Sequence, residues 1–337
     1  MAKKPRLPSS HRPIPTAPAG VSGRLLHMAG ADAAVRPDFE AVARELETRK
    51  VAALPDASDA AGEAELARAR AAVAEDPDDA LRQFQLGDAL RRAGRDAEAR
   101  LALERCLALD PEATSARFML AALGGAPVPE AMPPELVAAI FDAAAARFDQ
   151  TLVGALKYRG PELIAKTLAP MLAAFGRKLD VLDAGCGTGL AAPHLAPHAR
   201  RLDGVDLSVK MIEAAKARGV YDRLAVGELV TTLNDAPAGY DLVVAADVLV
   251  YVGALDATFA AAHRALRPGG LFAYTVESGT GGGFALSRAN RYRHDPAYVE
   301  DIATDAGFIL RHREDCTLRF ESGKPVEALI YVHARRA

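Results

Sequence analysis

Apolar residues change their spacing about halfway along this chain of 337 residues. Up to about residue 175 they recur at every third or fourth position, which is typical of helices that bury one face. Further on, short apolar runs alternate with helical stretches, and this alternation predicts a mostly parallel sheet with helices on both faces. The runs that we expect to be strands are 179–183, 202–206, 223–226, 240–246, 271–276, 308–312 and 327–333. The last two are too close in sequence for a crossover helix, so we expect them to pair antiparallel.

The helical first part contains a repeat. Asp76-Pro77 returns 34 positions later as Asp110-Pro111, and neighbouring apolar residues follow the same shift. Thirty-four residues is the tetratricopeptide period. The segment 80–113 resembles one full tetratricopeptide repeat, in which Gly87 and Ala99 are the small residues that let paired helices approach.

Only one complete repeat is visible, with a half on either side, and fewer than three repeats seldom stand alone. We therefore expect the helical module to pack against the domain that follows, or to bind a protein partner or a second copy of itself through residues 63–124. The expected parts are a disordered, basic, Pro-rich tail at 1–30, the helical module at 31–124 with a first helix at 38–54, a linker at 125–134, and a second domain at 135–337, whose lead-in helices occupy 135–175 and whose core sheet occupies 176–337.

Composition limits the partners and bound groups that we expect. The net charge of −3 gives no reason to expect a nucleic acid. The three cysteines form no Cys-x-x-Cys pair, and no His, Cys and carboxylate group has metal spacing, so we expect no disulfide framework and no metal. No apolar run approaches the ~20 residues that span a bilayer. We expect a cytoplasmic protein.

Candidate chemistry gathers after the first expected strand, in the sequence Asp183-Ala-Gly185-Cys-Gly187-Thr-Gly189. In a doubly wound sheet this turn is where ligands bind, and glycines let a ligand pass without meeting a Cβ. Asp206 ends the second strand, where a carboxylate can accept hydrogen bonds from a ribose diol. Nicotinamide-binding proteins share both features, so these residues alone leave that alternative open.

Three further features favour a different cofactor. Asp183 stands ahead of the glycines, where an anion would repel a pyrophosphate but suits the ammonium group of a methionine moiety. Glu228 follows the third strand and is placed to accept the exocyclic amine of an adenine. About 40 residues of helix precede the first strand, whereas a simple nicotinamide fold usually opens with that strand.

Five stretches carry a family resemblance: VLDAGCGTG at 181–189, GVDLS with Met211 at 204–211, LAVGEL at 224–229, YDLVVAADVL at 240–249 and LRPGG at 266–270. With them, residues 135–337 resemble a class I S-adenosylmethionine-dependent methyltransferase. The whole chain resembles the bacterial group that carries N-terminal tetratricopeptide repeats. The resemblance implies an α/β fold with a doubly wound, mostly parallel, Rossmann-like sheet and an antiparallel last strand, preceded by the all-α module.

The resemblance also implies roles for residues toward the cofactor, S-adenosylmethionine. The implied cofactor contacts are Asp183 to the amino group, Gly185, Gly187 and Gly189 along the methionine and ribose, Asp206 to the ribose hydroxyls, Leu207 and Met211 beside the adenine, Glu228 and Leu229 at the adenine edge, and Asp247 and Val248 closing the site.

The substrate side is expected near a flexible segment, Gly279–Gly283. Aromatic and basic residues follow it, so we expect a lid over the acceptor, with His294 and Tyr292 as candidate catalytic residues. The candidate substrate contacts are Tyr158, Tyr251, Glu277 and Arg293. A solvated cluster or buried packing is the alternative for these residues.

The leading hypothesis is therefore an enzyme that methylates a small molecule. A protein methyltransferase whose repeats recruit the client is the second hypothesis, because repeat solenoids present surfaces for peptides. A non-catalytic scaffold that binds S-adenosylmethionine is the third, and a nicotinamide oxidoreductase is the fourth.

Overall fold

The computed structural model describes residues 60–336 with the exception of residue 322. The expected tail at 1–30 and the expected helix at 38–54 lie outside the described residues. The described part of the helical module consists of α2 (Ala60–Glu75), α3 (Ala80–Arg92), α4 (Asp96–Leu109) and α5 (Thr114–Ala122). Helices α3 and α4 form the antiparallel pair that one tetratricopeptide repeat requires.

Small residues let α3 and α4 approach, as the repeat pattern predicts. A Cβ at Gly87 would lie 2.8 Å from the Leu103 side chain, so a larger residue would push the helices apart. Ala99 is fully buried between them. Asp79 caps the start of α3, because its carboxylate accepts a hydrogen bond from the Leu81 backbone N–H at 2.8 Å.

The stretch expected to be a linker, 125–134, is bound to the sheet domain. The Glu130 carbonyl accepts a hydrogen bond from the Gly253 N–H at 2.7 Å, and the Met132 N–H donates to the Tyr251 carbonyl at 2.9 Å. The Met132 side chain is buried. This stretch is therefore a strap along the sheet domain, a feature that its Gly and Pro content did not indicate.

The lead-in segment is helical but irregular. It contains α6 (Pro134–Ala144), the 3-10 turn η1 (Ala145–Arg147), the π-helical turn η2 (Gln150–Ala155) and α7 (Gly160–Ala174). Pro134 starts α6 at a position where proline is tolerated, because the first N–H of a helix has no partner within the helix. Single π-helical turns are frequent at functional sites.

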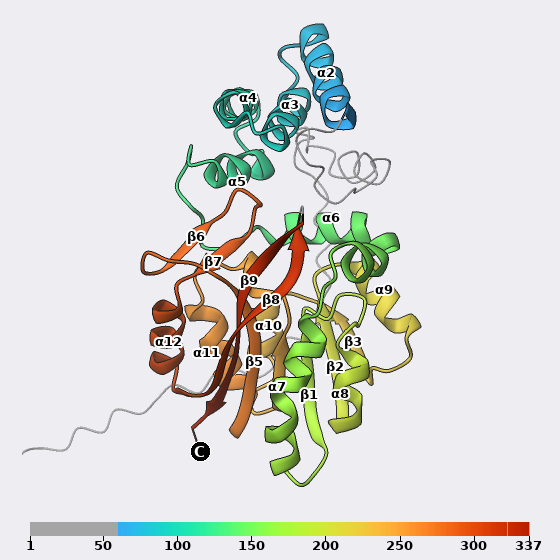
Figure 1. The fold of residues 1–337 in the computed structure, drawn as a ribbon, viewed down its shortest axis with the longest axis vertical. Coiled ribbons are helices and arrows are strands. Elements are labelled where there is room, and N and C mark those ends of the chain that lie inside the picture. The colour runs from blue at the N-terminus through green and yellow to red at the C-terminus, as the bar shows by residue number, and fades with distance from the viewer. Residues whose placement is uncertain (1–59, 322, 337) are drawn as a thin grey trace, which may run out of the picture. The chain divides into compact units, whose positions relative to one another are not determined.

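The sheet domain alternates strands and helices, as the apolar pattern predicts (Figure 1). Its strands are β1 (Leu179–Ala184), β2 (Ala199–Asp206), β3 (Arg223–Val226), β4 (Tyr240–Ala245), β5 (Leu266–Ser278), β6 (Phe284–Leu286), β7 (Tyr292–His294), β8 (Phe308–Glu321) and β9 (Lys324–Arg335). Its helices are α8 (Ala192–Leu195), η3 (Ala196–His198), α9 (Val209–Ala217), α10 (Leu229–Asn234), η4 (Leu249–Tyr251), α11 (Asp256–Ala265) and α12 (Pro296–Asp305).

Strands β3, β2, β1, β4 and β5 lie side by side in that order and are parallel. Strand β9 then pairs antiparallel with β5, and β8 pairs antiparallel with β9. This topology confirms the predicted doubly wound, mostly parallel sheet with an antiparallel last strand. The apolar pattern did not predict the β6–β7 hairpin, residues 284–294, which pairs with the last two residues of β5.

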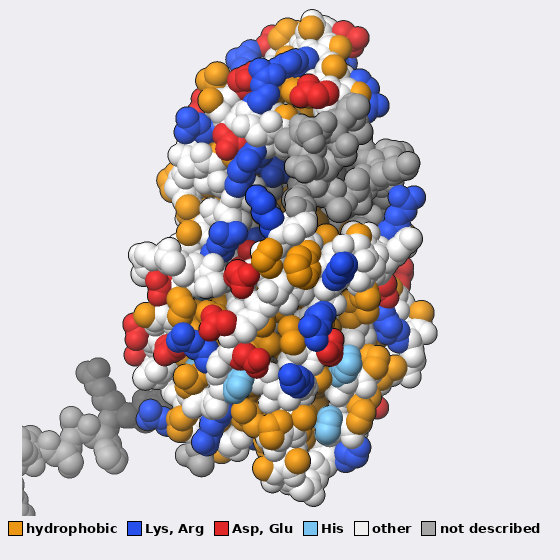
Figure 2. Space-filling view, viewed as in Figure 1, with side chains coloured by type: hydrophobic (Ala, Val, Ile, Leu, Met, Phe, Trp, Pro, Cys, Tyr) orange, Lys and Arg blue, Asp and Glu red, His pale blue; other side chains and the backbone are white. Residues whose placement is uncertain are grey.

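Two apolar layers hold the sheet between helices. Ile164 and Leu168 of α7 belong to the layer on one face, and Phe259 of α11 and Val299 of α12 belong to the layer on the other. On the surface shown in Figure 2, side chains of both charge signs are interspersed with apolar ones. Among the described residues, no helix is long and apolar enough to cross a membrane.

Candidate functional site

Acidic residues stand at the carboxyl ends of neighbouring parallel strands. Glu228 follows β3, Asp206 ends β2, Asp183 lies in β1 and Asp247 follows β4. Because adjacent strands are spaced ~4.8 Å apart, the ends of β3 and β4 are separated by about 14 Å along this edge of the sheet. A row of carboxylates of this length can receive an elongated ligand with several hydrogen-bond donors.

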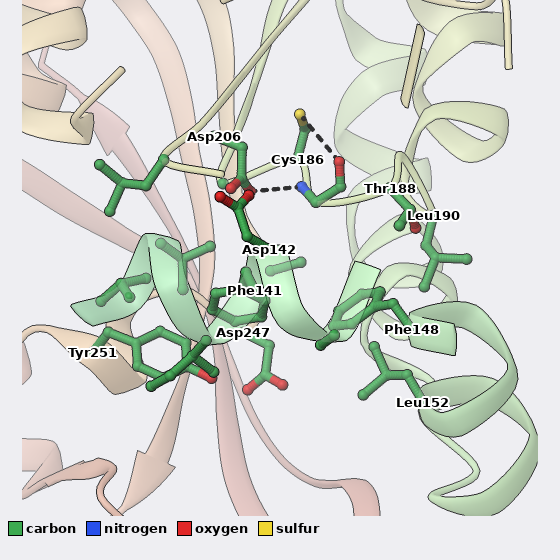
Figure 3. Close-up of a pocket in the computed structure, with 18 of the residues that line it drawn as sticks. Phe141, Asp142, Phe148, Leu152, Cys186, Thr188, Leu190, Asp206, Asp247 and Tyr251 are labelled. Atoms are coloured by element: carbon green, nitrogen blue, oxygen red, sulfur yellow. Dashed lines mark hydrogen bonds between the residues drawn. The ribbon is translucent and has the colours of Figure 1, made fainter. Parts of the chain in front are cut away.

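These four carboxylates line one cavity of about 660 Å³. Phe141, Asp142 and Phe148 of the lead-in segment also line it (Figure 3). That volume is in the range that encloses a small-molecule ligand. Two ends of the cavity differ in their chemistry. We call the part around Asp183, Asp206, Leu207, Glu228 and Leu229 the β2 end, and the part around Tyr158, Asp247, Tyr251, Arg291 and Arg319 the β4 end.

The glycine turn after β1 is shaped by its neighbours. Gly185 and Gly187 line the cavity and have positive φ, 73° and 54°. A Cβ at Gly185 would lie 2.4 Å from Val248, whereas a Cβ at Gly187 would have only Phe148 nearby, at 3.8 Å. A side chain at 187 would therefore occupy the cavity itself. Gly189 does not line the cavity.

Asp183 is a buried carboxylate that faces the cavity. The Tyr221 hydroxyl donates a hydrogen bond to its Oδ2 at 2.6 Å. Burial raises the pKa of Asp183 to about 7, and the hydrogen bond from Tyr221 opposes that rise. A cation placed beside this carboxylate would favour its ionised form, which burial disfavours.

Asp206 and Glu228 are held by backbone N–H groups. The Gly187 N–H donates to one Asp206 oxygen at 2.8 Å, and the Ser208 N–H donates to the other at 2.9 Å. Glu228 caps α10 by accepting from the Val230 N–H at 2.8 Å. Each carboxylate oxygen accepts about two hydrogen bonds. Both Asp206 oxygens therefore retain capacity toward a ligand.

The lead-in segment supplies cavity residues to which the sequence pattern assigned no role. Phe141 and Phe148 lie edge to face, with ring centroids 5.9 Å apart, and both line the cavity. Asp142, also in the lining, accepts a hydrogen bond from the Ser208 hydroxyl at 2.5 Å. The sequence signal that could have found these residues is their clustering at 140–149, in the lead-in segment that resembles the family.

A buried ionic cluster forms the wall of the β4 end. Arg319 of β8 is 1% exposed and donates to both oxygens of Asp247 at 2.9 and 2.8 Å, to Glu277 at 2.5 Å and to Glu321 at 2.8 Å. Burial alone would lower the pKa of Arg319, but the three carboxylates raise it above its ordinary value. Arg291 joins the cluster through an ion pair with Glu321. No local sequence motif marks Arg319, which lies 72 positions from Asp247.

Two tyrosines complete the β4 end. Tyr158 and Tyr251 line the cavity, as expected for substrate contacts. Burial raises the pKa of both hydroxyls, so both are protonated and can act as hydrogen-bond donors at neutral pH. A Cβ at Gly160 would lie 2.3 Å from the Tyr158 hydroxyl, so glycine at 160 makes room for this ring.

The structure corrects the expected lid. Tyr292 is fully buried, and its hydroxyl donates to the Pro129 carbonyl at 2.8 Å. His294 is also fully buried, and its Nε2 contacts the Val252 carbonyl at 2.9 Å. Burial lowers the pKa of His294 to about 4. Neither residue lines the cavity, because both side chains pack beneath the hairpin.

Four other expected contacts also lie outside the lining. Met211 lies on the buried face of α9, and the missing Cβ of Gly189 makes room for Arg218 and Tyr221. Glu277 reaches the site only indirectly, through Arg319 and Arg291, and the Arg293 side chain is 56% exposed. The expected residues that do line the cavity are Asp183, Gly185, Gly187, Asp206, Leu207, Glu228, Leu229, Asp247, Val248, Tyr158 and Tyr251. Within the described part of the chain, no three His, Cys, Asp or Glu side chains are grouped to hold a metal ion.

Family models match both parts of the chain. Residues 182–272 match a methyltransferase domain, and residues 79–123 match a tetratricopeptide repeat. The chain carries a methyltransferase domain and a tetratricopeptide repeat. The methyltransferase domain and the tetratricopeptide repeat predicted from the sequence motifs are thereby confirmed for these two stretches. The matched stretch includes the carboxyl ends of β1 to β4, where Asp183, Asp206, Glu228 and Asp247 lie.

The methyltransferase domain is similar to several named methyltransferases. Human methyltransferase-like protein 27 is 34% identical over 144 residues, which cover 41% of this chain and 56% of that protein. The malonyl-[acyl-carrier protein] O-methyltransferase of Hahella chejuensis is 39% identical over 139 residues, covering 40% of this chain and 47% of that protein. The chain thus spans about half the length of these relatives. The structure of magnesium protoporphyrin IX methyltransferase from Synechocystis with bound S-adenosylhomocysteine aligns with a TM-score of 0.49 at 18% identity, over 60% of this chain and 99% of that one.

Proposed function

We propose that this protein binds S-adenosylmethionine in the cavity and transfers its methyl group to an oxygen atom of a small acceptor. The observation that carries the proposal is the row of carboxylates along the β3–β2–β1–β4 edge, interrupted only by the glycine turn. A nucleoside with an amino-acid tail presents hydroxyl and ammonium donors over a comparable length.

The β2 end fits this donor molecule residue by residue. Asp206 has capacity for two ribose hydroxyls, and the buried carboxylate of Asp183 faces the position of the ammonium group. Leu207 and Leu229 supply apolar walls for the adenine. Glu228 has acceptor capacity left on Oε1, because its Oε2 already accepts two hydrogen bonds from Thr231.

The β4 end holds the acceptor. When bound, the sulfonium donor supplies an electrophilic methyl carbon, so the protein's own task is to orient the acceptor and to exclude water. Phe141, Phe148 and Leu152 provide an apolar enclosure for the acceptor's body. Tyr158 and Tyr251 supply hydroxyl donors to its reacting group.

At the β4 end, each described side chain that could act as a base is either ion-paired or protonated. The Asp247 carboxylate accepts two hydrogen bonds from Arg319, and the two tyrosines are protonated. We therefore propose an acceptor that brings an ionised oxygen of its own, such as a carboxylate. The relative from Hahella chejuensis, an O-methyltransferase named for malonyl-[acyl-carrier protein], agrees with this choice.

Titration calorimetry with S-adenosylmethionine, S-adenosylhomocysteine and NAD tests the donor, and binding of NAD alone would overturn the proposal. Mass spectrometry with labelled donor tests the acceptor. We expect methyl ester from octanoate or benzoate in preference to methyl ether from catechol at neutral pH, because catechol must first lose a proton. Transfer to catechol alone would overturn the ionised-acceptor assignment while leaving the donor assignment intact.

A further inference from the structure

The β6–β7 hairpin is weakly attached to its own sheet. Strand β7 pairs with β5 at only two positions, Glu277 and Ser278. The loop that precedes the hairpin contains Gly281, Gly282 and Gly283, all with positive φ. Few ladder bonds and a glycine loop give a segment little local stability, so other contacts must hold it in place.

The helical module provides such contacts at the hairpin tip. Arg91 of α3 donates to the Arg288 carbonyl at 3.1 Å, and the Arg288 guanidinium donates back to the Arg91 carbonyl. Arg288 also lies 2.9 Å from an Asp96 oxygen at the start of α4. Arg91 is itself fixed by a buried ion pair with Asp88 at 2.8 Å.

A second anchor lies four residues further along the hairpin. Tyr292 is fully buried and meets Phe118 of α5 edge to face, with ring centroids 6.2 Å apart. Its hydroxyl donates to the Pro129 carbonyl in the strap at 2.8 Å. The module thus contacts the hairpin through α3, α4 and α5.

Arg291 lies between the two anchors and lines the cavity at the β4 end. Its guanidinium pairs with Glu321 and lies 3.7 Å from Glu277, within the cluster that Arg319 organises. Arg288 and Arg291 belong to one closed turn, because the Ser287 N–H donates to the Arg291 carbonyl at 2.7 Å and the Asn290 N–H donates to the Ser287 carbonyl at 2.9 Å. A displacement of Arg288 is therefore passed to the backbone of Arg291.

We infer that Arg288 is a positioning residue through which the helical module sets the place of Arg291 in the acceptor part of the cavity. The module is then a component of the acceptor site as well as a surface for partners, and this role rests on the proposed function of the β4 end. A ligand that pulled α3 and α4 away from the hairpin would change acceptor binding while leaving the β2 end intact.

Amide hydrogen exchange over residues 284–294 of the full chain tests the anchor directly. We expect Arg288→Ala to speed exchange roughly fivefold, which corresponds to the loss of contacts worth about 1 kcal/mol. Arg105→Ala is the matched control, because Arg105 makes a similarly exposed ion pair, with Asp78, that does not touch the hairpin. Unchanged exchange in Arg288→Ala would overturn the inference, whereas Phe118→Leu tests the second anchor separately.

A functional measurement separates this inference from the proposed function. With labelled donor and benzoate as probe, we expect Arg288→Ala to raise KM for benzoate about threefold or more, with S-adenosylhomocysteine affinity unchanged, and Arg288→Lys to recover part of the loss. Loss of S-adenosylhomocysteine binding in the variant would contradict the inference. Absence of that binding in the wild type would contradict the proposed function instead, and the exchange experiment would still decide the anchor.

Discussion

The two ends of the cavity are built in different ways. The β2 end consists of strand ends and the turns that follow them, within a stretch of about 50 residues, and backbone N–H groups orient its acids. The β4 end collects Tyr158, Asp247, Arg291 and Arg319 from four separate segments, and ion pairs between side chains hold it together. A site built on backbone is fixed by the fold, whereas a site built on side-chain pairs depends on each partner.

The largest effect expected from this contrast is on stability. Arg319→Met leaves three acidic partners without their buried cation, so we expect a loss of about 3–5 kcal/mol in the free energy of unfolding. Chemical denaturation measures it. Arg200→Met is the control, because the Arg200 side chain is 67% exposed where it pairs with Asp180. Equal effects from the two variants would contradict a special role for the cluster.

At the β2 end the largest expected effect is on affinity. Gly187→Val places a branched side chain in the cavity at a residue with positive φ, so we expect S-adenosylhomocysteine affinity to fall by about 100-fold or more. Gly219→Val is a control for backbone strain alone, because Gly219 also has positive φ but open space around it. Calorimetry on folded variants would show the difference, and retained affinity in Gly187→Val would remove the turn from the donor site.

Removing one charge at the β2 end should cause a smaller loss of donor affinity. Asp206→Asn keeps the shape but removes the charge-assisted hydrogen bonds to the ribose, so we expect roughly tenfold weaker donor binding without loss of fold. Asp222→Asn is the matched control, since the Asp222 carboxylate accepts from the Leu202 N–H at 2.7 Å away from the cavity. Unchanged affinity in Asp206→Asn would show that the ribose lies elsewhere.

The smallest expected effect is a shift in pH dependence. In the proposed donor complex Asp183 faces the ammonium group, which it attracts only when ionised. Because burial raises the pKa of Asp183 to about 7, donor affinity should fall as the pH falls through 7. Tyr221→Phe removes the hydrogen bond that favours the carboxylate. It should move this midpoint to higher pH and weaken binding at pH 7 by about two- to fivefold. Tyr240→Phe, which removes a hydroxyl from Asp203 instead, should leave the midpoint unchanged. If the midpoint is the same in Tyr221→Phe as in the wild type, the titrating group is not Asp183.

The same contrast explains which parts of the site a sequence pattern can predict. Strand ends, glycines and acids of the β2 end are local in sequence, so their pattern alone predicts that Asp183, Asp206 and Glu228 share one edge of the sheet. Arg319 reaches the site because β8 pairs with β9, and Arg291 reaches it through the hairpin. No local sequence pattern predicts either pairing. His294 and Tyr292 were wrongly expected at the acceptor because a glycine-rich segment suggested a lid. Their rings are instead needed to fill the space beneath the hairpin.

The strap at 125–134 limits where the helical module can be exchanged for that of another protein. Its Met132 side chain lines the cavity and its Glu130 carbonyl is bonded to the sheet domain, although in sequence both residues precede every strand of the sheet. A chimera that exchanges the repeats for those of another protein should therefore keep its junction near Gly124 or Gly125. A cut a few residues later would also remove strap residues from the cavity, and the resulting loss of activity could not be assigned to the exchanged repeats alone.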